Sequence, residues 1–466
     1  MATRSYGACV LCQKAVVVKM MCRGMSAAAH SLPQVDFLKG EIHRKHPGVT
    51  NLKTLRLPEE LQMAAQSIIH RAQVTRLADR TQSLTNFLWK RKRAVEDSTL
   101  RQKAMSLEKE LWLKAMEKKG DVDEQALDDR IRKKVVSELR RTTYHWTPMK
   151  YDEELGVVYM AARLAGGYAA VRRALNEIKK RDLSFAPQTL LDFGSGLGTV
   201  VWASHSCWGD TLKEMVCVDS SATMNILAER LLKGDDERAE PHIKQVYFRQ
   251  FLPVSPKVQF DLVTAAFTLS ELRNLKDREE TVTTLWRKTS SYLVLVENGT
   301  KEGHQMLMEA RDTLLNTQEK TVFDPRPASV FAPCPHELMC PKLAREQVKP
   351  CNFQQNYQPL PLPKHSDQQR EKFIYLILSR TPPARPETEG VEWARLTAPV
   401  QRRTRHVHCR MCCSDGKLQH LVLTARKHSR DVYRCARSSD WGDQVPITQS
   451  ADEDIEADSE IEADSE

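Results

Sequence analysis

Four short apolar runs alternate with helix-length segments in the middle of the chain, and this alternation constrains the fold more than any other feature. The runs are TLLDFG (189–194), EMVCVD (214–219), QFDLVTAAF (259–267) and SYLVLVEN (291–298), with segments such as SATMNILAERLLKG between them. Continuous apolar runs of this length are typical of buried parallel strands. The pattern predicts an α/β fold with a parallel sheet and right-handed crossovers. A further strand, KFIYLILSR (372–380), is expected to close or extend the sheet.

The first run ends in a glycine loop, LLDFGSGLGT (190–199). Glycines there let the backbone turn and approach a ligand closely. An acid, Asp219, ends the next strand, 21 residues after Gly198, where a carboxylate can accept both ribose hydroxyls of an adenosine cofactor. An acid before the loop, and Thr199 in place of a further glycine, favour S-adenosylmethionine (SAM) over a dinucleotide, with a structural turn as the remaining alternative. The predicted cofactor-binding residues are Asp192, Gly194, Ser195, Gly196, Gly198 and Asp219.

Residues that would carry out methyl transfer are not recognisable. The segment AAFTLSELRNL (265–275) lacks the polar residue followed by Pro-Pro-aromatic that methylation of an exocyclic base nitrogen usually needs. Cys334, in the sequence APCP, has the character of a pyrimidine-attacking nucleophile, but it belongs to a cysteine group that favours metal ligation. Ser270 and Glu271 remain as polar candidates in the pocket. We assign no catalytic residue and expect cofactor binding without turnover.

Most of the remaining chemistry lies in two groups of cysteines. The groups are Cys334, Cys340 and Cys351 in one segment and Cys409, Cys412 and Cys413 in another. Three thiols from one segment and a fourth from a distant one suit a metal site that joins the two segments. The spacings Cx5C and Cx10C match no ordinary zinc finger or ferredoxin. On chemistry alone, zinc, an iron–sulfur cluster, mixed ligation with nearby histidines and unliganded cysteines all stay open.

The charge of the chain favours a polyanionic partner. The net charge is +9, but residues 451–466 hold nine carboxylates, so the rest of the chain carries +18. RNA is the natural partner of such a body. Basic residues gather in RIRKKVVSELRR (130–141), where a solvated helix face is the alternative, and around Tyr433 in 402–437. No apolar stretch reaches the roughly 20 residues that span a bilayer, so we expect no membrane insertion. We predict no obligate homo-oligomer.

Composition shifts divide the chain into units. The first 35 residues are basic and hydroxylated, and the first acid is Asp36, which is typical of a mitochondrial presequence; a secretory signal and an untargeted tail are the alternatives. The segment 151–181 has helical spacing and is expected to form one or two helices broken near Gly166 and Gly167. The predicted units are a mitochondrial presequence (1–35), an α-helical basic N-terminal region (36–150), a SAM-binding methyltransferase-like core (151–310), a cysteine-containing insertion with the closing strand (311–383), a small basic C-terminal unit (384–442) and an acidic disordered tail (443–466).

Seven segments together resemble one known family. They are RTTYHW (141–146), VYMAARLAGGYAAV (158–171), LLDFGSGLG (190–198), FRQFLPVSPKVQFDLV (248–263), LVLVENGTKEGH (293–304), FAPCPHELMCP (331–341) and RHVHCRMCC (405–413). In these segments the chain strongly resembles the methyltransferase-like assembly factors of the mitochondrial small ribosomal subunit. The resemblance covers nearly everything beyond the presequence, and only the acidic repeat differs from the family. It implies a Rossmann-like class I SAM-dependent methyltransferase fold and a place in the mitochondrial matrix.

The resemblance also implies a function and a ligand set. Such factors bind small-subunit rRNA near the junction of head and body, keep a SAM pocket without methyltransferase turnover, and hold a four-iron four-sulfur (4Fe-4S) cluster. By motif, the cluster ligands map to Cys334, Cys340, Cys351 and one cysteine of CRMCC, for which we choose Cys412. The gap before Cys351 is longer than the family pattern, although CNFQQ matches the segment after the third ligand. An active rRNA methyltransferase is the alternative, and a cluster that gates ribosome assembly is compatible with the first function.

Overall fold

The structure of the chain is a computed structural model that describes residues 38, 42–117, 124–255, 257–316, 324–344, 349–363, 366–380 and 391–448. The presequence expected at 1–35 and the acidic repeat at 451–466 lie outside the described residues. The N-terminal elements are η1 (His43–Lys45), α2 (Glu59–Ala72), α3 (Leu77–Lys90), α4 (Asp97–Met116) and α5 (Glu124–Thr142). Among the described helices, none is long and apolar enough to cross a membrane.

The core that follows alternates helices and strands as expected. Its elements are α6 (Glu153–Arg181), β1 (Thr189–Phe193), α7 (Thr199–Trp208), β2 (Glu214–Val218), α8 (Ala222–Leu232), β3 (Val246–Arg249), β4 (Phe260–Ala266), η2 (Leu269–Glu271), α9 (Leu275–Arg287), β5 (Thr289–Asn298), α10 (Lys301–Asn316), β6 (Ser329–Ala332), β7 (Phe353–Tyr357) and β8 (Gln369–Ser379). The last strand is the one expected at 372–380.

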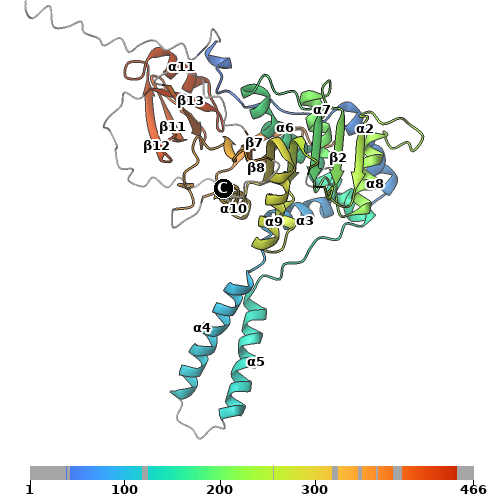
Figure 1. The fold of residues 1–466 in the computed structure, drawn as a ribbon, viewed down its shortest axis with the longest axis vertical. Coiled ribbons are helices and arrows are strands. Elements are labelled where there is room, and N and C mark those ends of the chain that lie inside the picture. Colours follow the sequence, from blue (N-terminus) through green and yellow to red (C-terminus); the bar gives the residue numbers. More distant parts are fainter. Residues whose placement is uncertain are drawn as a thin grey trace, which may run out of the picture.

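These strands form one sheet in the order β3-β2-β1-β4-β5-β8-β6, with β7 also paired to β8 (Figure 1). Strands β1 to β5 pair in parallel, and β8 runs antiparallel to β5, β6 and β7. The strand order reverses between β1 and β4, and open α/β sheets bind ligands at the carboxyl ends of strands at such a point. This confirms the predicted α/β fold of methyltransferase type and places the glycine loop after β1 at the expected ligand site.

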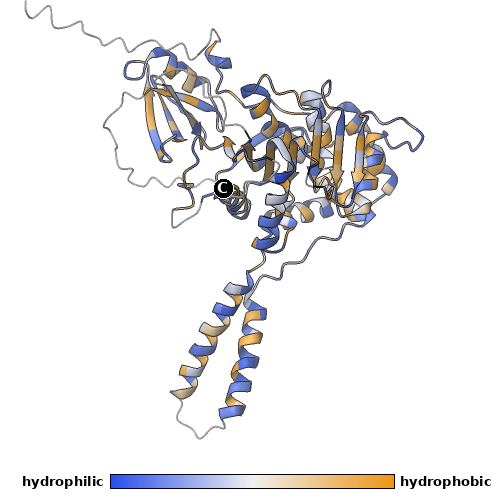
Figure 2. Cartoon of the chain, viewed as in Figure 1, coloured by the Kyte–Doolittle hydropathy of each residue, from blue (hydrophilic) through white to orange (hydrophobic). Residues whose placement is uncertain are grey.

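Apolar residues fill both faces of the sheet, which explains why the strands read as continuous runs. In β5, Val294 and Val296 pack in the cluster that includes α6 and α7, whereas Leu293 and Leu295 pack in the cluster that includes α9 and α10. Successive side chains of a strand point to opposite faces, so a strand covered on both sides must be apolar throughout. Figure 2 shows the orange strands between helices that are blue on their outer sides.

The expectation of a helix break near Gly166 and Gly167 is wrong, because α6 is one continuous helix from Glu153 to Arg181. The glycines serve close packing instead. A Cβ atom on Gly166 would lie 2.4 Å from Oε2 of Glu371 on β8. Glu371 in turn pairs with Arg163, one turn earlier on α6, at 2.9 Å. The bare backbone at Gly166 therefore lets a strand with a buried carboxylate lie directly against the helix.

The C-terminal unit is a separate antiparallel sheet. Its elements are β9 (Val391–Leu396), β10 (Gln401–Arg402), β11 (His406–Cys412), β12 (Leu418–Thr424), α11 (Arg430–Ser438) and β13 (Gln444–Thr448). The strand order is β10-β11-β9-β13, and β12 pairs with β11. Because β13 pairs along the whole of β9, the sheet continues beyond residue 442, where we expected the unit to end. Its core includes Leu396, Val407, Met411 and Val445.

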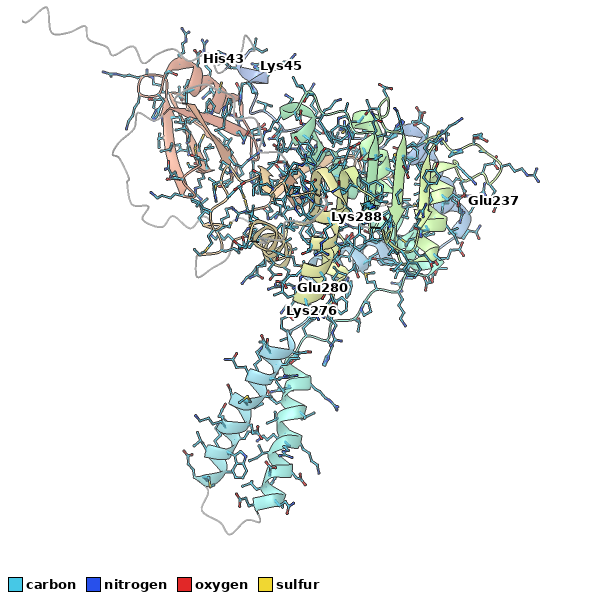
Figure 3. The ribbon with its side chains drawn as sticks, viewed as in Figure 1. His43, Lys45, Glu237, Lys276, Glu280 and Lys288 are labelled. Carbon is cyan, nitrogen blue, oxygen red and sulfur yellow. The ribbon has the colours of Figure 1, made fainter. Side chains whose placement is uncertain are left out.

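The segment before α2 crosses between the two sheets. His43 and Lys45 lie beside the C-terminal unit (Figure 3), and Nε2 of His43 is 2.8 Å from Oδ1 of Asp431 on α11. Further along, the backbone N–H of Thr50 donates to Oδ1 of Asp443, and the side chain of Asn176 on α6 donates to the carbonyl of Thr50. A short segment of the N-terminal region thus bonds to both units and holds them side by side.

Helices α4 and α5 form a hairpin that projects away from the rest of the molecule (Figure 1). Arg91 anchors its base, because its guanidinium pairs with Glu271 and donates to the carbonyl of Thr147, where the chain returns from α5. The same guanidinium lies 5.2 Å from the centroid of the Trp146 ring. The predicted helical N-terminal region therefore divides into helices that pack on the core and an arm that does not.

Candidate metal centre and nucleoside-binding loop

The glycine loop takes the shape that close ligand approach requires. Gly194, Gly196 and Gly198 all have positive φ angles, of 71°, 51° and 69°. The N–H groups of Gly194 and Ser195 both donate to the carbonyl of Val218, which ties the loop to the end of β2. A Cβ atom on Gly194 would lie 2.3 Å from Oγ1 of Thr268, so a side chain there has no room. Glycine at these positions relieves backbone strain and, at Gly194, a steric clash.

The two acids of the predicted set sit on either side of this loop. Asp219 accepts a hydrogen bond from Gly196 N through Oδ2 and one from Ser221 N through Oδ1, both at 2.8 Å. Each oxygen keeps a lone pair, so the carboxylate fits the two hydroxyls of a ribose. Asp192 is fully buried, and neither of its oxygens has a partner within the described residues. Burial, together with the charge of Asp219, raises the pKa of Asp192 well above its ordinary value.

The side of the pocket where a methyl acceptor would sit offers little chemistry. Phe267, directly after β4, has a positive φ of 60°. The hydroxyl of Ser270 lies 3.4 Å from the carbonyl of Phe267, to which it donates, and the carboxylate of Glu271 is neutralised by Arg91. Both polar candidates named from the sequence are therefore engaged in holding the local structure. A carboxylate paired with a guanidinium is a poor proton acceptor.

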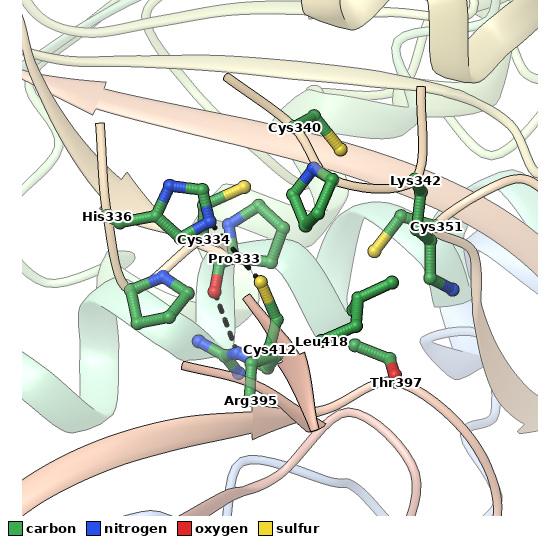
Figure 4. A pocket seen from close by; sticks show the side chains of 12 residues that line it. Pro333, Cys334, His336, Cys340, Lys342, Cys351, Arg395, Thr397, Cys412 and Leu418 are labelled. Atoms are coloured by element: carbon green, nitrogen blue, oxygen red, sulfur yellow. Dashed lines mark hydrogen bonds between the residues drawn. The ribbon is translucent and has the colours of Figure 1, made fainter. Parts of the chain in front are cut away.

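The four cysteines chosen as metal ligands line one pocket between the core and the C-terminal unit (Figure 4). Three of them come from the segment between β6 and β7, and the fourth comes from β11. The wall is completed by His336, Lys342, Arg395 and Leu418, among others. Nε2 of His336 lies 3.3 Å from Sγ of Cys412, and Nε2 of His304 lies 3.6 Å from Sγ of Cys340. The ligand-set residues are Cys334, Cys340, Cys351 and Cys412.

Strand geometry explains which cysteine of CRMCC reaches the pocket. Cys409 and Cys413 belong to the hydrophobic core of the C-terminal sheet, as does Met411 between them. Cys412 lies on the opposite face of β11, since side chains alternate along a strand. Its register partner on β9 is Arg395, which also lines the pocket. The choice of Cys412 among the three cysteines thus agrees with the face of the strand that meets the core.

The surroundings of the pocket bear on the protonation of its four thiols. None of the four cysteines forms a disulfide. Burial, followed by the neighbouring Cys351, raises the pKa of the Cys334 thiol to about 12, and a coordinated metal reverses this effect because it binds the thiolate. Within the described residues no three His, Cys, Asp or Glu side chains stand close enough for a single metal ion. The four thiols line one pocket, and thiolates are the ligands that both zinc ions and iron–sulfur clusters take.

Two buried residues that the sequence did not single out hold this region together. Glu177 on α6 accepts from Arg395 at 2.8 Å, from Arg173 at 3.0 Å and from the hydroxyl of Tyr375 at 2.9 Å. Arg395 also donates to the carbonyl of Pro333, the residue before Cys334, at 2.9 Å. Burial opposes the charge of Glu177, but the two arginines outweigh it and hold its pKa far below the ordinary value. The only sequence signal was a charged residue inside an apolar helix or strand.

Two relatives of known name match long stretches of the chain. Ribosome assembly protein METTL17, mitochondrial, of Homo sapiens is 50% identical over 429 residues, which cover 91% of each chain. The Rsm22-cox11 tandem protein 2, mitochondrial, of Schizosaccharomyces pombe is 25% identical over 325 residues, which cover 62% of this chain and 43% of that protein.

Two solved methyltransferases are among the structures that match part of the chain. Magnesium protoporphyrin IX methyltransferase of Synechocystis PCC 6803, with bound SAH, has a TM-score of 0.29 and 12% identity, and the match covers 54% of this chain and 97% of that one. Ribosomal protein L11 methylase of Lactobacillus delbrueckii has a TM-score of 0.26 and 13% identity, over 45% and 76% of the two chains. At such scores the likeness carries no weight, and the fold assignment rests on strand order. The family model described as mitochondrial small ribosomal subunit Rsm22 matches residues 153–446, and the chain belongs to this family.

Proposed function

We propose that this chain is an assembly factor of the mitochondrial small ribosomal subunit that works in the matrix by binding rRNA. The family carries the name of that subunit, and the human relative is named a mitochondrial ribosome assembly protein. In this proposal the methyltransferase-like core and the basic C-terminal unit act as one RNA-binding body. The contacted region is the rRNA at the junction of head and body.

The observation that carries the proposal is the pocket of four cysteines, because it lies where the two units meet. Three thiols belong to the core side and Cys412 to the C-terminal sheet. A group bound there would fix the orientation of the basic unit on the core. The group proposed is a 4Fe-4S cluster held by Cys334, Cys340, Cys351 and Cys412, which supplies four iron–thiolate bonds across the junction.

The C-terminal unit presents chemistry that suits RNA. Ten basic residues between 402 and 437 face only two acids, and most of their side chains are exposed. On the face of β11 that also carries Cys412, Nδ1 of His408 lies 3.2 Å from Nε2 of His420 on β12, and the His406 and His408 rings are 5.0 Å apart between centroids. Guanidinium groups bind phosphates, and imidazole rings can stack on bases.

The proposal includes SAM as a bound cofactor without methyl transfer. The unpartnered carboxylate of Asp192, the spare lone pairs of Asp219 and the glycine loop all suit a nucleoside. When bound, SAM would supply an activated methyl group. Neither polar candidate named from the sequence is free to act as a base there, since Glu271 is paired with Arg91 and Ser270 bonds to the backbone. Binding then serves to order the loop and the adjoining helices.

The test compares two cysteine-to-alanine variants on the same strand. Cys412→Ala removes a thiol from the pocket, whereas Cys409→Ala removes one from the core of the C-terminal sheet. Each full-length protein is isolated anaerobically, and iron, sulfide and rRNA affinity are measured. We expect the wild type and Cys409→Ala to hold about four irons and four sulfides per chain, and Cys412→Ala to lose most of both together with rRNA affinity.

Three results would contradict the proposal. Zinc without iron in the wild type would rule out the cluster. Unchanged rRNA affinity in an iron-free Cys412→Ala protein would separate the cluster from RNA binding. Transfer of labelled methyl from SAM to small-subunit rRNA by the purified protein would establish the alternative function, an active rRNA methyltransferase.

A further inference from the structure

The arm formed by α4 and α5 is the part of the chain that neither the cysteine pocket nor the glycine loop uses. It stands clear of both sheets (Figure 1), and no residue of α4 is buried. On α5 only Ile131 and Val135 are buried, with exposed fractions of 4% and 7%. With so little apolar packing, the arm contributes little to the stability of the fold. Its surface is therefore the feature to explain.

The basic residues of α5 all avoid the packed face. At 3.6 residues per turn, Ile131 and Val135 mark one side of the helix, and Lys133 and Arg140 fall roughly opposite them. An open groove runs along that outer side, and its lining residues are Arg132, Lys133, Val136, Ser137 and Arg140. Val136 is 48% exposed in the middle of this row. The groove thus presents three cations and a hydroxyl to solvent on the side away from α4.

Two of the three cations have no ionic partner among the residues that the structure describes. Arg132 pairs with Asp128 at 3.0 Å on the same helix. Within the described residues, Lys133 and Arg140 take part in no ion pair, and three of the four acids of α5 lie in its first two turns. Residues 130–142 hold six bases and one acid. Repulsion between like charges on one helix face destabilises the free helix slightly, and a bound polyanion removes that cost.

We propose that the outer groove of α5 is a second RNA-binding surface, which grips the phosphate backbone of rRNA through Arg132, Lys133 and Arg140. The inference rests on the proposed function, because it assigns a further contact to the same rRNA-binding protein. Charge complementarity identifies the ligand as a polyanion, and the phosphates are the anionic groups of RNA that three cations on one helix face would contact. The arm lets the protein reach RNA at a distance from the C-terminal unit.

The experiment uses two full-length variants with equal loss of charge on the same arm. The groove variant is Arg132→Gln, Lys133→Gln and Arg140→Gln. The control is Arg101→Gln, Lys103→Gln and Lys109→Gln on α4, whose side chains are also exposed. Affinity for a transcript of the mitochondrial small-subunit rRNA is measured between 50 and 200 mM salt, and thermal unfolding checks that both variants fold.

Three lost phosphate contacts should lower the slope of log affinity against log salt by about 2 to 3. The ratio of wild-type to groove-variant affinity should therefore shrink roughly 20- to 40-fold between 50 and 200 mM salt. The control should keep the wild-type slope.

Each other outcome overturns a distinct claim. If the wild type fails to bind the transcript, the proposed function falls. If the wild type binds and the groove variant matches it, or the control weakens equally, the groove is not an RNA site while the proposed function stands. If the groove variant binds the transcript normally yet no longer joins ribosomal particles, the arm docks on protein and the inference is wrong.

Discussion

Replacing Glu177 by glutamine should destabilise the protein far more than one hydrogen bond suggests. The substitution keeps the shape and an acceptor oxygen but removes the negative charge that pairs with both Arg173 and Arg395, whose side chains are each 1% exposed. Both guanidinium groups would stay buried, charged and close together. Breaking a buried pair in this way typically costs about 3–5 kcal/mol, against a total stability of about 5–15 kcal/mol for a domain.

The assay is urea unfolding of Glu177→Gln beside Glu154→Gln, which breaks an exposed pair with Arg80 and should cost only about 0–1 kcal/mol. Hydrogen exchange should also accelerate in β9, since Arg395 lies on that strand. Because the folded-state pKa of Glu177 is depressed, its contribution is present above the unfolded value of 4.5 and is lost as the pH falls below it. A free-energy loss below about 1 kcal/mol would refute the idea that this carboxylate holds two buried charges.

Two further perturbations test the packing of α6 and of the N-terminal segment. Gly166→Ala should lower the free energy of unfolding in urea by roughly 2–4 kcal/mol, because its Cβ would lie 2.4 Å from the buried carboxylate of Glu371. The control Gly167→Ala, whose Cβ has its nearest contact at 3.7 Å, should stabilise α6 by up to about 1 kcal/mol. Equal effects of the two substitutions would show that helix propensity alone decides the outcome. Burial lowers the pKa of His46 to about 4, so between pH 6.5 and 4 the unfolded protein binds a proton at this side chain that the folded protein does not. The free energy of unfolding should therefore fall by roughly 3 kcal/mol over this pH range. His46→Gln should remove that part of the pH dependence, and parallel curves of unfolding free energy against pH for the two proteins would contradict the reasoning.

The fold of the core could be predicted because its signals are local. Strands covered on both faces leave unbroken apolar runs, and the parallel order follows from helices between them. The continuity of α6 could not be predicted, because a glycine pair inside a helical pattern usually indicates a break. The reason for Gly166 is Glu371, some 200 residues later, which lies against it in the folded protein. Likewise β13 was hidden in a segment that looked like the start of the acidic tail, and only its pairing with β9 reveals it.

The site was predictable where residue type alone implies chemistry. Cysteines and loop glycines can be recognised from residue type, so the two cysteine groups and the glycine loop could be named from the sequence, whereas the set of four thiols came from the family resemblance. The roles of Arg395 and Glu177 could not be predicted in this way. A charged residue is common in any sequence, and its burial here depends on a partner far along the chain. The roles of Ser270 and Glu271 were equally hidden, because the residue that neutralises Glu271 is Arg91, at the base of the arm.

The placement of Arg395 explains why a charge network and a thiol pocket occur at the same junction. Its guanidinium reaches Glu177 of the core, the carbonyl of Pro333 beside the cysteine segment and the carbonyl of Gly442 in the C-terminal unit. Apolar packing would join the two units without the desolvation cost of buried charges, but it would let one unit slide over the other. Buried hydrogen bonds in fixed directions do not allow such sliding. Cys412 is the register partner of Arg395, so the orientation set by the arginine also sets where that thiol points. The charge network thus fixes one docking angle, and at that angle thiols from both units line the same pocket.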